Sequence, residues 1–248
     1  MLRVFRCDLH IHTCLSPCGD LDMYPRAIVR KSLEKGLDCI AICDHNTAEN
    51  AGFVEKAAAG LPLKVIFGME VTSREEVHVV ALFENSSNVI PFQEMVYRHL
   101  PGSNIEEKFG CQPIVNEKDE VEGFCDRLLI GATDLPLKTI IDAVHEAGGV
   151  AIAAHIDRES FSVIGQLGFI SPDMRFDAVE VSPRLSIGEA RRLFPELKHL
   201  TFITSSDAHF IGDIGKGATE IMMFSPTVRE LKMAFHNEKG RQVIYGHD

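Results

Sequence analysis

The chain has 248 residues, of which 45% are hydrophobic, and a formal net charge of −11 at pH 7. This length fits one large domain over residues 1–248, since α/β barrels of roughly 200–250 residues form single domains. The negative charge disfavours stable binding to polymeric nucleic acid and leaves a small phosphorylated substrate as the expected partner.

The cysteines and the hydropathy pattern predict a soluble, cytoplasmic protein. Seven cysteines are an odd number in a chain too long to depend on disulfide bonds, so reduced thiols are expected. No N-terminal signal pattern precedes the first predicted strand, and no apolar run approaches the roughly 18 residues of a membrane span. No membrane partner is therefore expected, and the oligomeric state has no signal in the sequence.

Residues 7–13 read Cys-Asp-Leu-His-Ile-His-Thr and are predicted to form the first strand. Alternate side chains of a strand point to opposite faces, so His10 and His12 should project together. Leu9 and Ile11 should then pack behind them. An isolated His-x-His pair fits a solvated edge strand as well as a metal site, so other parts of the chain must decide.

Strands and helices are predicted to alternate up to residue 83. Pro25 suits the first turn of a helix, and Gly36 ends that helix. Short apolar runs mark buried strands. In chain order, the elements after the first strand are a loop at Ser16–Asp20, a helix from Pro25, a strand at Cys39–Cys43, a helix at Ala48–Ala59, and strands at Lys64–Val71 and His78–Phe83.

The alternation weakens at about residues 84–135, which we expect to form an insertion over one face of the domain. Phe92–His99 is predicted to be helical, and Gln112–Phe124 to form a β-hairpin. Strands and helices then alternate again to the end of the chain. These elements are a helix at Leu137–Ala147, strands at Val150–His155 and Asp177–Ser182, a helix at Ile187–Phe194, a strand from Thr201, a strand at Ile221–Phe224, a helix from Pro226 to about His236 and a strand at Val243–Tyr245.

This pattern predicts an α/β fold whose parallel sheet closes into a barrel. Six or seven buried strands alternating with helices favour a barrel, and an open α/β sheet is the alternative. Neither Gly-x-Gly-x-x-Gly nor a Walker-type loop occurs in the sequence, which removes the main support for a nucleotide-binding open sheet.

Metal-competent side chains follow the predicted strands, at the ends where functional groups collect in parallel barrels. The residues in these positions are His45, Glu70, His155, Asp207 and His209. His78 instead starts its apolar run, so it would need a strand that runs in the other direction. The remaining histidines are treated as ordinary surface or core residues: His99, His145, His199, His236 and His247.

A shared metal cluster explains this set best, because burying so many polar groups without a common partner would carry several desolvation costs. Imidazole and carboxylate ligands suit zinc, manganese or iron, and they outnumber the ligands of a single tetrahedral zinc. Two or three divalent ions are therefore expected, with Glu70 as a bridging ligand. Such a site makes its own nucleophile, a metal-bridging hydroxide, because the ions lower the pKa of bound water.

Five stretches in this order resemble the polymerase and histidinol phosphatase (PHP) family of metal-dependent phosphoesterases. They are residues 8–13 (Asp-Leu-His-Ile-His-Thr), 43–46 (Cys-Asp-His-Asn), 68–70 (Gly-Met-Glu), 154–155 (Ala-His) and 206–209 (Ser-Asp-Ala-His). The resemblance implies a distorted (β/α)7 barrel that holds up to three metal ions. It implies one ion on His10, His12, Glu70 and Asp207, a second on Glu70, His78 and His155, and a third on His45, His209 and a residue of the first loop.

The loop residue is where this sequence departs from the pattern of the family. Cys18 lies six positions after His12, at the spacing of a family histidine, and a thiolate is a competent zinc ligand. Asp20 is the alternative, and either residue could instead serve only the turn of a Pro/Gly loop. Asp8 and Asp44 are expected to accept the distal ring N–H of ligand histidines and so orient them.

Arg158 and Arg184 follow predicted strands and could each offer a bidentate fork to a phosphate, with Lys216 as a weaker candidate. Surface ion pairs are the alternative role for both arginines. With Asp207 and His209, these arginines are the predicted catalytic residues.

The sequence therefore predicts an enzyme that hydrolyses a phosphoric ester, most simply a small phosphomonoester such as a nucleotide or metabolite phosphate. A phosphodiesterase acting on short oligonucleotides stays open. The alternatives are an amidohydrolase-like metal-dependent hydrolase and a non-catalytic metal-binding regulatory module. Against the last, nearly all of the family's ligands are present in this chain.

Overall fold

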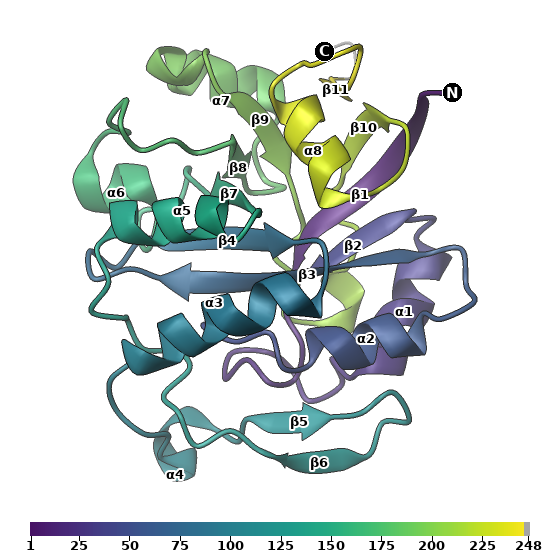
Figure 1. The fold of residues 1–248 in the computed structure, drawn as a ribbon, viewed down its shortest axis with the longest axis vertical. Helices are drawn as coiled ribbons and strands as arrows, with labels where there is room; N and C mark the ends of the chain where they lie inside the picture. Colours follow the sequence, from purple (N-terminus) through teal and green to yellow (C-terminus); the bar gives the residue numbers. More distant parts are fainter. Residues whose placement is uncertain (246–248) are drawn as a thin grey trace.

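A nine-stranded sheet that curls into a nearly closed barrel organises residues 1–245, the part of the chain that the computed structural model describes (Figure 1). The sheet order is β11-β10-β1-β2-β3-β4-β7-β8-β9. Its strands are β1 (Arg3–Ile11), β2 (Cys39–Ile42), β3 (Lys64–Thr72), β4 (His78–Phe83), β7 (Val150–Ala153), β8 (Ala178–Val181), β9 (Thr201–Thr204), β10 (Thr219–Met223) and β11 (Gln242–Ile244).

The barrel closes where the chain that follows β9 meets the end of β1. Ala208 pairs with Ile11 in a parallel bridge, and the backbone N–H of His12 donates to the Ala208 carbonyl at 3.0 Å. Seven strands, β1 to β4 and β7 to β9, thus surround the barrel, while β10 and β11 extend the sheet antiparallel beside β1. The prediction of a distorted seven-stranded barrel within a single α/β domain is confirmed.

The expectation of an all-parallel sheet is wrong for β4, which runs antiparallel to both β3 and β7. Residues 73–77 join β3 to β4, and so short a connection cannot cross over to a parallel neighbour. The reversal places His78, at the start of β4, beside Thr72 at the end of β3. His78 therefore lies at the end of the barrel where the parallel strands finish. The sequence predicted this reversed strand direction if His78 was to join the other metal-competent residues.

Eight helices lie outside this sheet in the described chain, and the longer ones pack their apolar faces against it. The structure starts α2 three residues later than predicted. It also starts α3 six residues earlier, and this helix contains Pro91. The helices are α1 (Pro25–Glu34), α2 (Ala51–Ala57), α3 (Ser86–Arg98), α4 (Glu106–Phe109), α5 (Leu137–Glu146), α6 (Val163–Leu167), α7 (Ile187–Leu193) and α8 (Val228–Phe235), with short 3-10 turns at Pro195–Leu197 and Ile211–Asp213.

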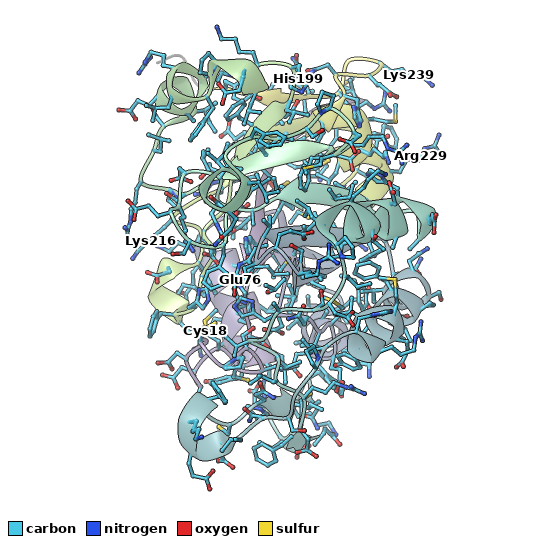
Figure 2. The ribbon with its side chains drawn as sticks, turned by 90° about the vertical axis from the view of Figure 1, so that its left-hand side faces the viewer. Cys18, Glu76, His199, Lys216, Arg229 and Lys239 are labelled. Atoms are coloured by element: carbon cyan, nitrogen blue, oxygen red, sulfur yellow. The ribbon has the colours of Figure 1, made fainter. Side chains whose placement is uncertain are left out.

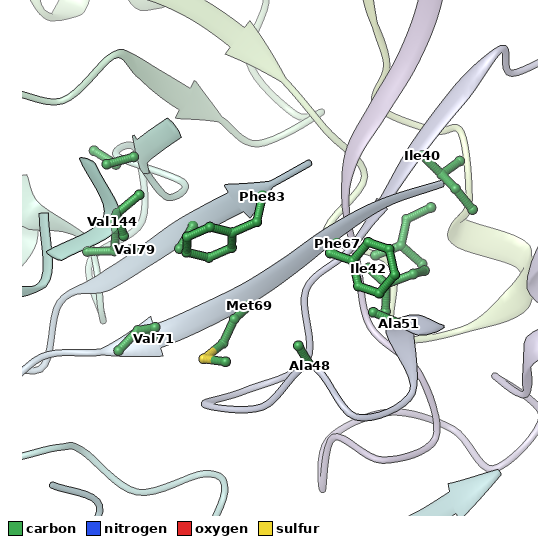
Figure 3. Packing of buried hydrophobic residues seen from close by; sticks show 14 of the residues in the cluster. Ile40, Ile42, Ala48, Ala51, Phe67, Met69, Val71, Val79, Phe83 and Val144 are labelled. Atoms are coloured by element: carbon green, nitrogen blue, oxygen red, sulfur yellow. The ribbon is translucent and has the colours of Figure 1, made fainter. Parts of the chain in front are cut away.

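Strand alternation divides the core into two layers. Ile40 and Ile42 of β2 face the helices, in the cluster shown in Figure 3, whereas Cys39 and Ala41 belong to a cluster inside the barrel. On β3, Phe67, Met69 and Val71 belong to the outer layer in the same way. The alternation therefore points Glu70, which lies between Met69 and Val71, into the barrel.

The predicted β-hairpin in the insertion is present as β5 (Pro113–Val115) and β6 (Val121–Phe124). Two asparagines that follow β2 attach the insertion to the barrel. The Asn50 side chain accepts from the Val115 N–H at 3.1 Å, and the Asn46 amide donates to the carbonyls of Leu129 and Gly131, each at 2.8 Å. The insertion is thus fixed to the segment that carries His45.

No helix within residues 1–245 is both long enough and apolar enough to cross a membrane. The predicted strand at Val243–Tyr245 overlaps β11, and His247 lies outside the described residues.

Replacing Gly68 with alanine should destabilise the barrel, because a Cβ at this position of β3 would lie 2.6 Å from Cys43 Sγ and 2.7 Å from the Ile42 carbonyl oxygen. Overpacking of this kind lowers the free energy of unfolding by about 1–3 kcal/mol. Chemical denaturation measures the change. Gly123→Ala in β6 is the matched control, since a Cβ there meets no atom within 4 Å. Equal stabilities of the two variants would contradict the tight contact of β2 and β3.

Candidate metal centre

The carboxylate of Glu70 is the centre of a buried group of side chains at one end of the barrel. Its 1% exposure excludes nearly all water, and five imidazoles approach its two oxygens. The N–O distances are 2.8 Å to His78 Nδ1, 3.1 Å to His45 Nδ1, 3.2 Å to His155 Nε2, 3.4 Å to His10 Nε2 and 3.5 Å to His12 Nε2. The structure thus gathers residues from β1, β3 and β4 and from the ends of β2 and β7 around one carboxylate.

Asp207 adds a second carboxylate beside the His10–His12 pair. Its Oδ1 lies 3.1 Å from His12 Nε2 and 3.5 Å from His10 Nε2, and these two nitrogens are 3.2 Å apart. Together with Glu70, these two imidazoles form a group whose ligand atoms lie within 4.8 Å of one another. The two-residue spacing of the first motif therefore aims both rings at one point.

The side chains of Cys18 and Asp20 have different neighbours. Cys18 Sγ lies within 4.8 Å of ligand atoms of His12, His45 and His209 in another group, and Figure 2 labels this cysteine in the loop that follows β1. The Asp20 carboxylate instead accepts the N–H of Asp22 at 2.8 Å, within its own loop. The geometry therefore favours Cys18 over Asp20 as the loop ligand.

The ionisable groups of the site differ in protonation. Burial lowers the pKa of His10, but the carboxylates of Glu180, Asp207 and Glu70 outweigh this effect and raise the pKa well above its usual value. Burial raises the pKa of the Cys18 thiol to about 12. Burial lowers the pKa of His45 well below its usual value and lowers that of His12 to about 4, so both rings are neutral at pH 7. Burial raises the pKa of the Glu70 carboxyl, but the neighbouring His78 and His10 outweigh this effect and hold the pKa well below its usual range. Neutral imidazoles and ionised carboxylates are the forms that bind metal ions.

Unpartnered atoms support the same conclusion. The Nδ1 atoms of His45, His78 and His155 are buried and make no hydrogen bond within the described chain. Two of these atoms, those of His45 and His78, lie close to Glu70 oxygens without hydrogen-bond geometry. Buried polar atoms are normally satisfied, and a divalent cation shared with Glu70 would satisfy both nitrogens. The residues present therefore fit metal ions.

Glu180 of β8 belongs to the site although the sequence analysis assigned it no role. Its Oε1 lies 3.0 Å from His10 Nδ1, and it also accepts the His155 N–H at 3.3 Å. A carboxylate on the distal nitrogen fixes the orientation of a ligand imidazole, which is the role expected of Asp8 and Asp44. The only signal in the sequence is an acidic residue inside the buried run of residues 178–181.

The predicted contacts of Asp8 with ligand histidines are wrong, and those of Asp44 are indirect. Asp8 accepts the N–H groups of Ser206 and Gly215, each at 2.9 Å, and so holds the segment that precedes Asp207. Asp44 accepts from Thr13 and from the Ser16 hydroxyl, at 2.7 Å each. The Ser16 oxygen in turn lies 3.0 Å from His12 Nδ1, so Asp44 acts on His12 through this serine.

The backbone is strained at several positions of the site. His155 has φ 27°, Asp207 has φ 49° and Asn46 has φ 53°, all in the left-handed region that non-glycine residues avoid. Such conformations cost of order 1–3 kcal/mol each and persist where the surrounding structure fixes them. At His155 and Asp207 they turn side chains that follow β7 and β9 towards Glu70.

A cavity of about 960 Å³ opens beside the Glu70-centred group. His78, His155 and Asp207 form its inner wall, and Arg158, Arg184 and Lys216 contribute cationic groups. Arg158 forms an ion pair with Asp207 Oδ2 at 2.6 Å, and Lys216 pairs with Asp213. Arg184 makes no ion pair within residues 1–245, which leaves its guanidinium group free to bind an anion.

The histidines treated as ordinary residues lie apart from the cluster. His145 and His236 contact Asp177 at 2.8 and 2.9 Å, and His99 contacts Asp134 at 2.6 Å. His199 contacts a carbonyl of its own turn.

Comparison with known proteins identifies the family. The sequence profile of the PHP domain matches residues 8–159, which is more than half of the chain and includes eight of the ten predicted metal ligands. The chain belongs to the PHP family. A second profile, described as PHP-associated, matches residues 189–239.

Two relatives illustrate the activities found among similar proteins. A protein of Haemophilus influenzae named 5'-3' exoribonuclease is 24% identical in an alignment of 190 positions that covers 60% of this chain and 68% of that protein. A solved structure from Bifidobacterium adolescentis, proposed to be a metal-dependent phosphoesterase, superimposes with a TM-score of 0.55 and 20% identity, over 82% of this chain and 87% of that chain.

The lesion-specific endonuclease Q of Pyrococcus furiosus shares the fold over 97% of this chain, with a TM-score of 0.75 and 18% identity. This chain spans 58% of the length of that endonuclease. A second structure of endonuclease Q, with a TM-score of 0.67, holds a duplex substrate with an abasic lesion. A protein that shares this fold therefore binds nucleic acid, and the net charge alone does not exclude such a partner.

Replacing Cys18 with serine should lower the number of bound metal ions by about one, because a hydroxyl is a poor substitute for a thiolate ligand. Elemental analysis of purified, metal-loaded protein measures the stoichiometry. Asp20→Asn is the matched control and should leave it unchanged, since Asp20 serves its own loop. Loss of an ion in Asp20→Asn, with none lost in Cys18→Ser, would reassign the loop ligand.

Replacing Glu180 with glutamine should weaken the binding of the ion on His10 by about 10–100-fold, because partners of ligand histidines have effects of this size. Titration against a chromogenic chelator measures the affinity. The exposed Glu220→Gln in β10 controls for loss of a carboxylate elsewhere. Equal affinities in Glu180→Gln and wild type would show that Glu180 has only a structural role.

Proposed function

We propose that this PHP-family protein hydrolyses phosphomonoesters of small molecules, such as nucleotides or other metabolite phosphates, with two or three divalent metal ions. The observation that carries the proposal is that the candidate metal ligands and several cationic side chains border the same cavity. The Glu70-centred group of imidazoles borders a cavity whose other walls carry Arg158, Arg184 and Lys216. Metal ligands and phosphate-binding cations beside one cavity are what phosphoester hydrolysis requires.

The proposed ligand sets are those that the resemblance to the PHP family implies, with Cys18 as the loop ligand, and the groups of close ligand atoms in the structure overlap them without matching them fully. Zinc, manganese and iron suit these donors. One ion would be held by His10, His12, Glu70 and Asp207, a second by Glu70, His78 and His155, and a third by His45, His209 and Cys18. When bound, such ions stabilise negative charge on phosphoryl oxygens and make water a nucleophile near neutral pH.

The protein's own groups would position the ester. Asp207 contacts the His10–His12 pair through one oxygen and Arg158 through the other, so it links the metal ligands to a phosphate-binding arginine. Arg184 offers a second guanidinium fork, suited to bidentate contact with phosphate. The ring of His209 stacks on His12 with centroids 4.2 Å apart and stays partly accessible, so it would act by holding its ion close to the ester. The net reaction consumes one water and releases an alcohol and inorganic phosphate.

Hydrolysis of phosphodiesters in oligonucleotides is the second candidate function. It is favoured by the relative named 5'-3' exoribonuclease and by the endonuclease Q complex with a duplex. The net charge of −11 favours the small substrate, because a strongly negative surface repels a long phosphate backbone.

Phosphate release tests the proposal. The protein, loaded with manganese or zinc, is assayed against a panel of phosphomonoesters and against 5'-phosphorylated single-stranded RNA and DNA. We expect phosphate from monoesters, and we expect His10→Ala to lower kcat by more than about 100-fold, above the range for residues that only contact ligands. His199→Ala, an exposed histidine that contacts only its own turn, should keep full activity.

Two or more bound metal ions with no turnover of any phosphoester would overturn the proposal and favour the non-catalytic module. Amide hydrolysis without phosphate release would favour the amidohydrolase alternative. Shortening of the oligonucleotides without activity on monoesters would establish the second candidate function.

A further inference from the structure

Phe161 has an unusual position at the edge of the metal centre. It lies in the loop between β7 and α6, and its ring stacks on the ring of His78, with centroids 4.7 Å apart and an interplanar angle of 17°. It lines the cavity beside Arg158 and Arg184, and 42% of the residue remains exposed. One face of this ring is therefore covered by a proposed metal ligand, while the residue borders the space proposed for the substrate.

The loop holds Phe161 in this place at a conformational cost. Its φ of 60° lies in the left-handed region, which is a genuine outlier for a bulky residue. The Phe161 carbonyl accepts the His78 N–H at 2.8 Å, and the adjacent Ser162 hydroxyl donates to the Arg158 carbonyl at 2.5 Å. Strain that is maintained by such contacts is characteristic of functional sites.

The surroundings of the ring make a purely structural role a poor explanation. Arg158, Arg184, Lys216, Asp157 and Ser182 make most of the cavity wall polar, and Phe161 is the one phenyl ring that lines it within residues 1–245. An apolar ring exposed among charged groups gains little from burial. A planar group that stacks on it would cover the ring while leaving the cations to a phosphate.

From this geometry we propose that Phe161 is a stacking platform for a nucleobase, so that the substrate is a nucleotide rather than an aliphatic metabolite phosphate. This inference rests on the proposed phosphomonoesterase function and narrows its substrate class. A cavity of about 960 Å³ can hold a nucleotide, since small-molecule sites span roughly 300–1,000 Å³. The phosphate would lie between the metal ligands and Arg158 or Arg184, and the base over Phe161.

The test compares adenosine 5'-monophosphate with glycerol 3-phosphate in Phe161→Leu and Phe161→Tyr. Stacking on an aromatic ring contributes enough that Phe161→Leu should lower kcat/KM for the nucleotide by about tenfold, chiefly through KM. The loss of kcat/KM for glycerol 3-phosphate should be smaller, because this substrate has no planar base to stack on the ring. Phe161→Tyr keeps the ring and should keep nucleotide activity within about twofold. Phe169→Leu, at a phenylalanine that is 58% exposed and does not line the cavity, is the matched control.

Calorimetric binding of adenosine 5'-monophosphate to the metal-loaded protein separates this inference from the proposed function. Binding that is weakened in Phe161→Leu and kept in Phe161→Tyr supports the platform, whether or not the wild type releases phosphate. Failure of the wild type to release phosphate would overturn only the proposed function. Equal nucleotide affinity in Phe161→Leu and wild type would overturn the platform. So would an equal loss of activity on both substrates, because it would show that the ring serves only to support His78.

Discussion

The ionised carboxylate of Glu70 is the constraint on which the rest of the structure depends. It lies inside the barrel, almost without solvent, and a buried charge is tolerated only where other groups compensate it. Side chains on four different strands, or just after them, supply this compensation, because five imidazoles lie within 3.5 Å of its oxygens. Closure of the barrel, reversal of β4 and the strained turns after β7 and β9 all bring these groups to one carboxylate.

Features that depend on short sequence patterns could be predicted. The alternation of apolar residues identified the strands, and polar residues at their ends identified the ligand candidates. The number of residues that connect two strands was equally informative, because the five residues between β3 and β4 are too few for a parallel crossover. The direction of β4 could therefore have been derived from the sequence, and His78 already required it.

Features that depend on contacts between distant segments could not be predicted. Glu180 meets His10 across 170 positions of the chain, and nothing local to either residue shows that they are partners. A register irregularity in β1 between Asp8 and Ile11 could not be predicted from the local sequence either. It leaves Leu9 and Ile11 in different core layers, although simple alternation placed them together behind the histidine pair. The same irregularity leaves Asp8 bound to the segment before Asp207 rather than to an imidazole.

The loop after β7 joins metal binding to substrate binding. Within seven residues it carries His155 against Glu70, Arg158 against Asp207 and Phe161 against His78. Ser162 closes this loop on the Arg158 carbonyl, so the three side chains belong to one hydrogen-bonded segment. Ions that fix His155 and His78 would also fix the arginine and the phenyl ring that face the cavity. Metal loading should therefore organise the phosphate-binding and base-binding surfaces together, because the same short segment supplies both.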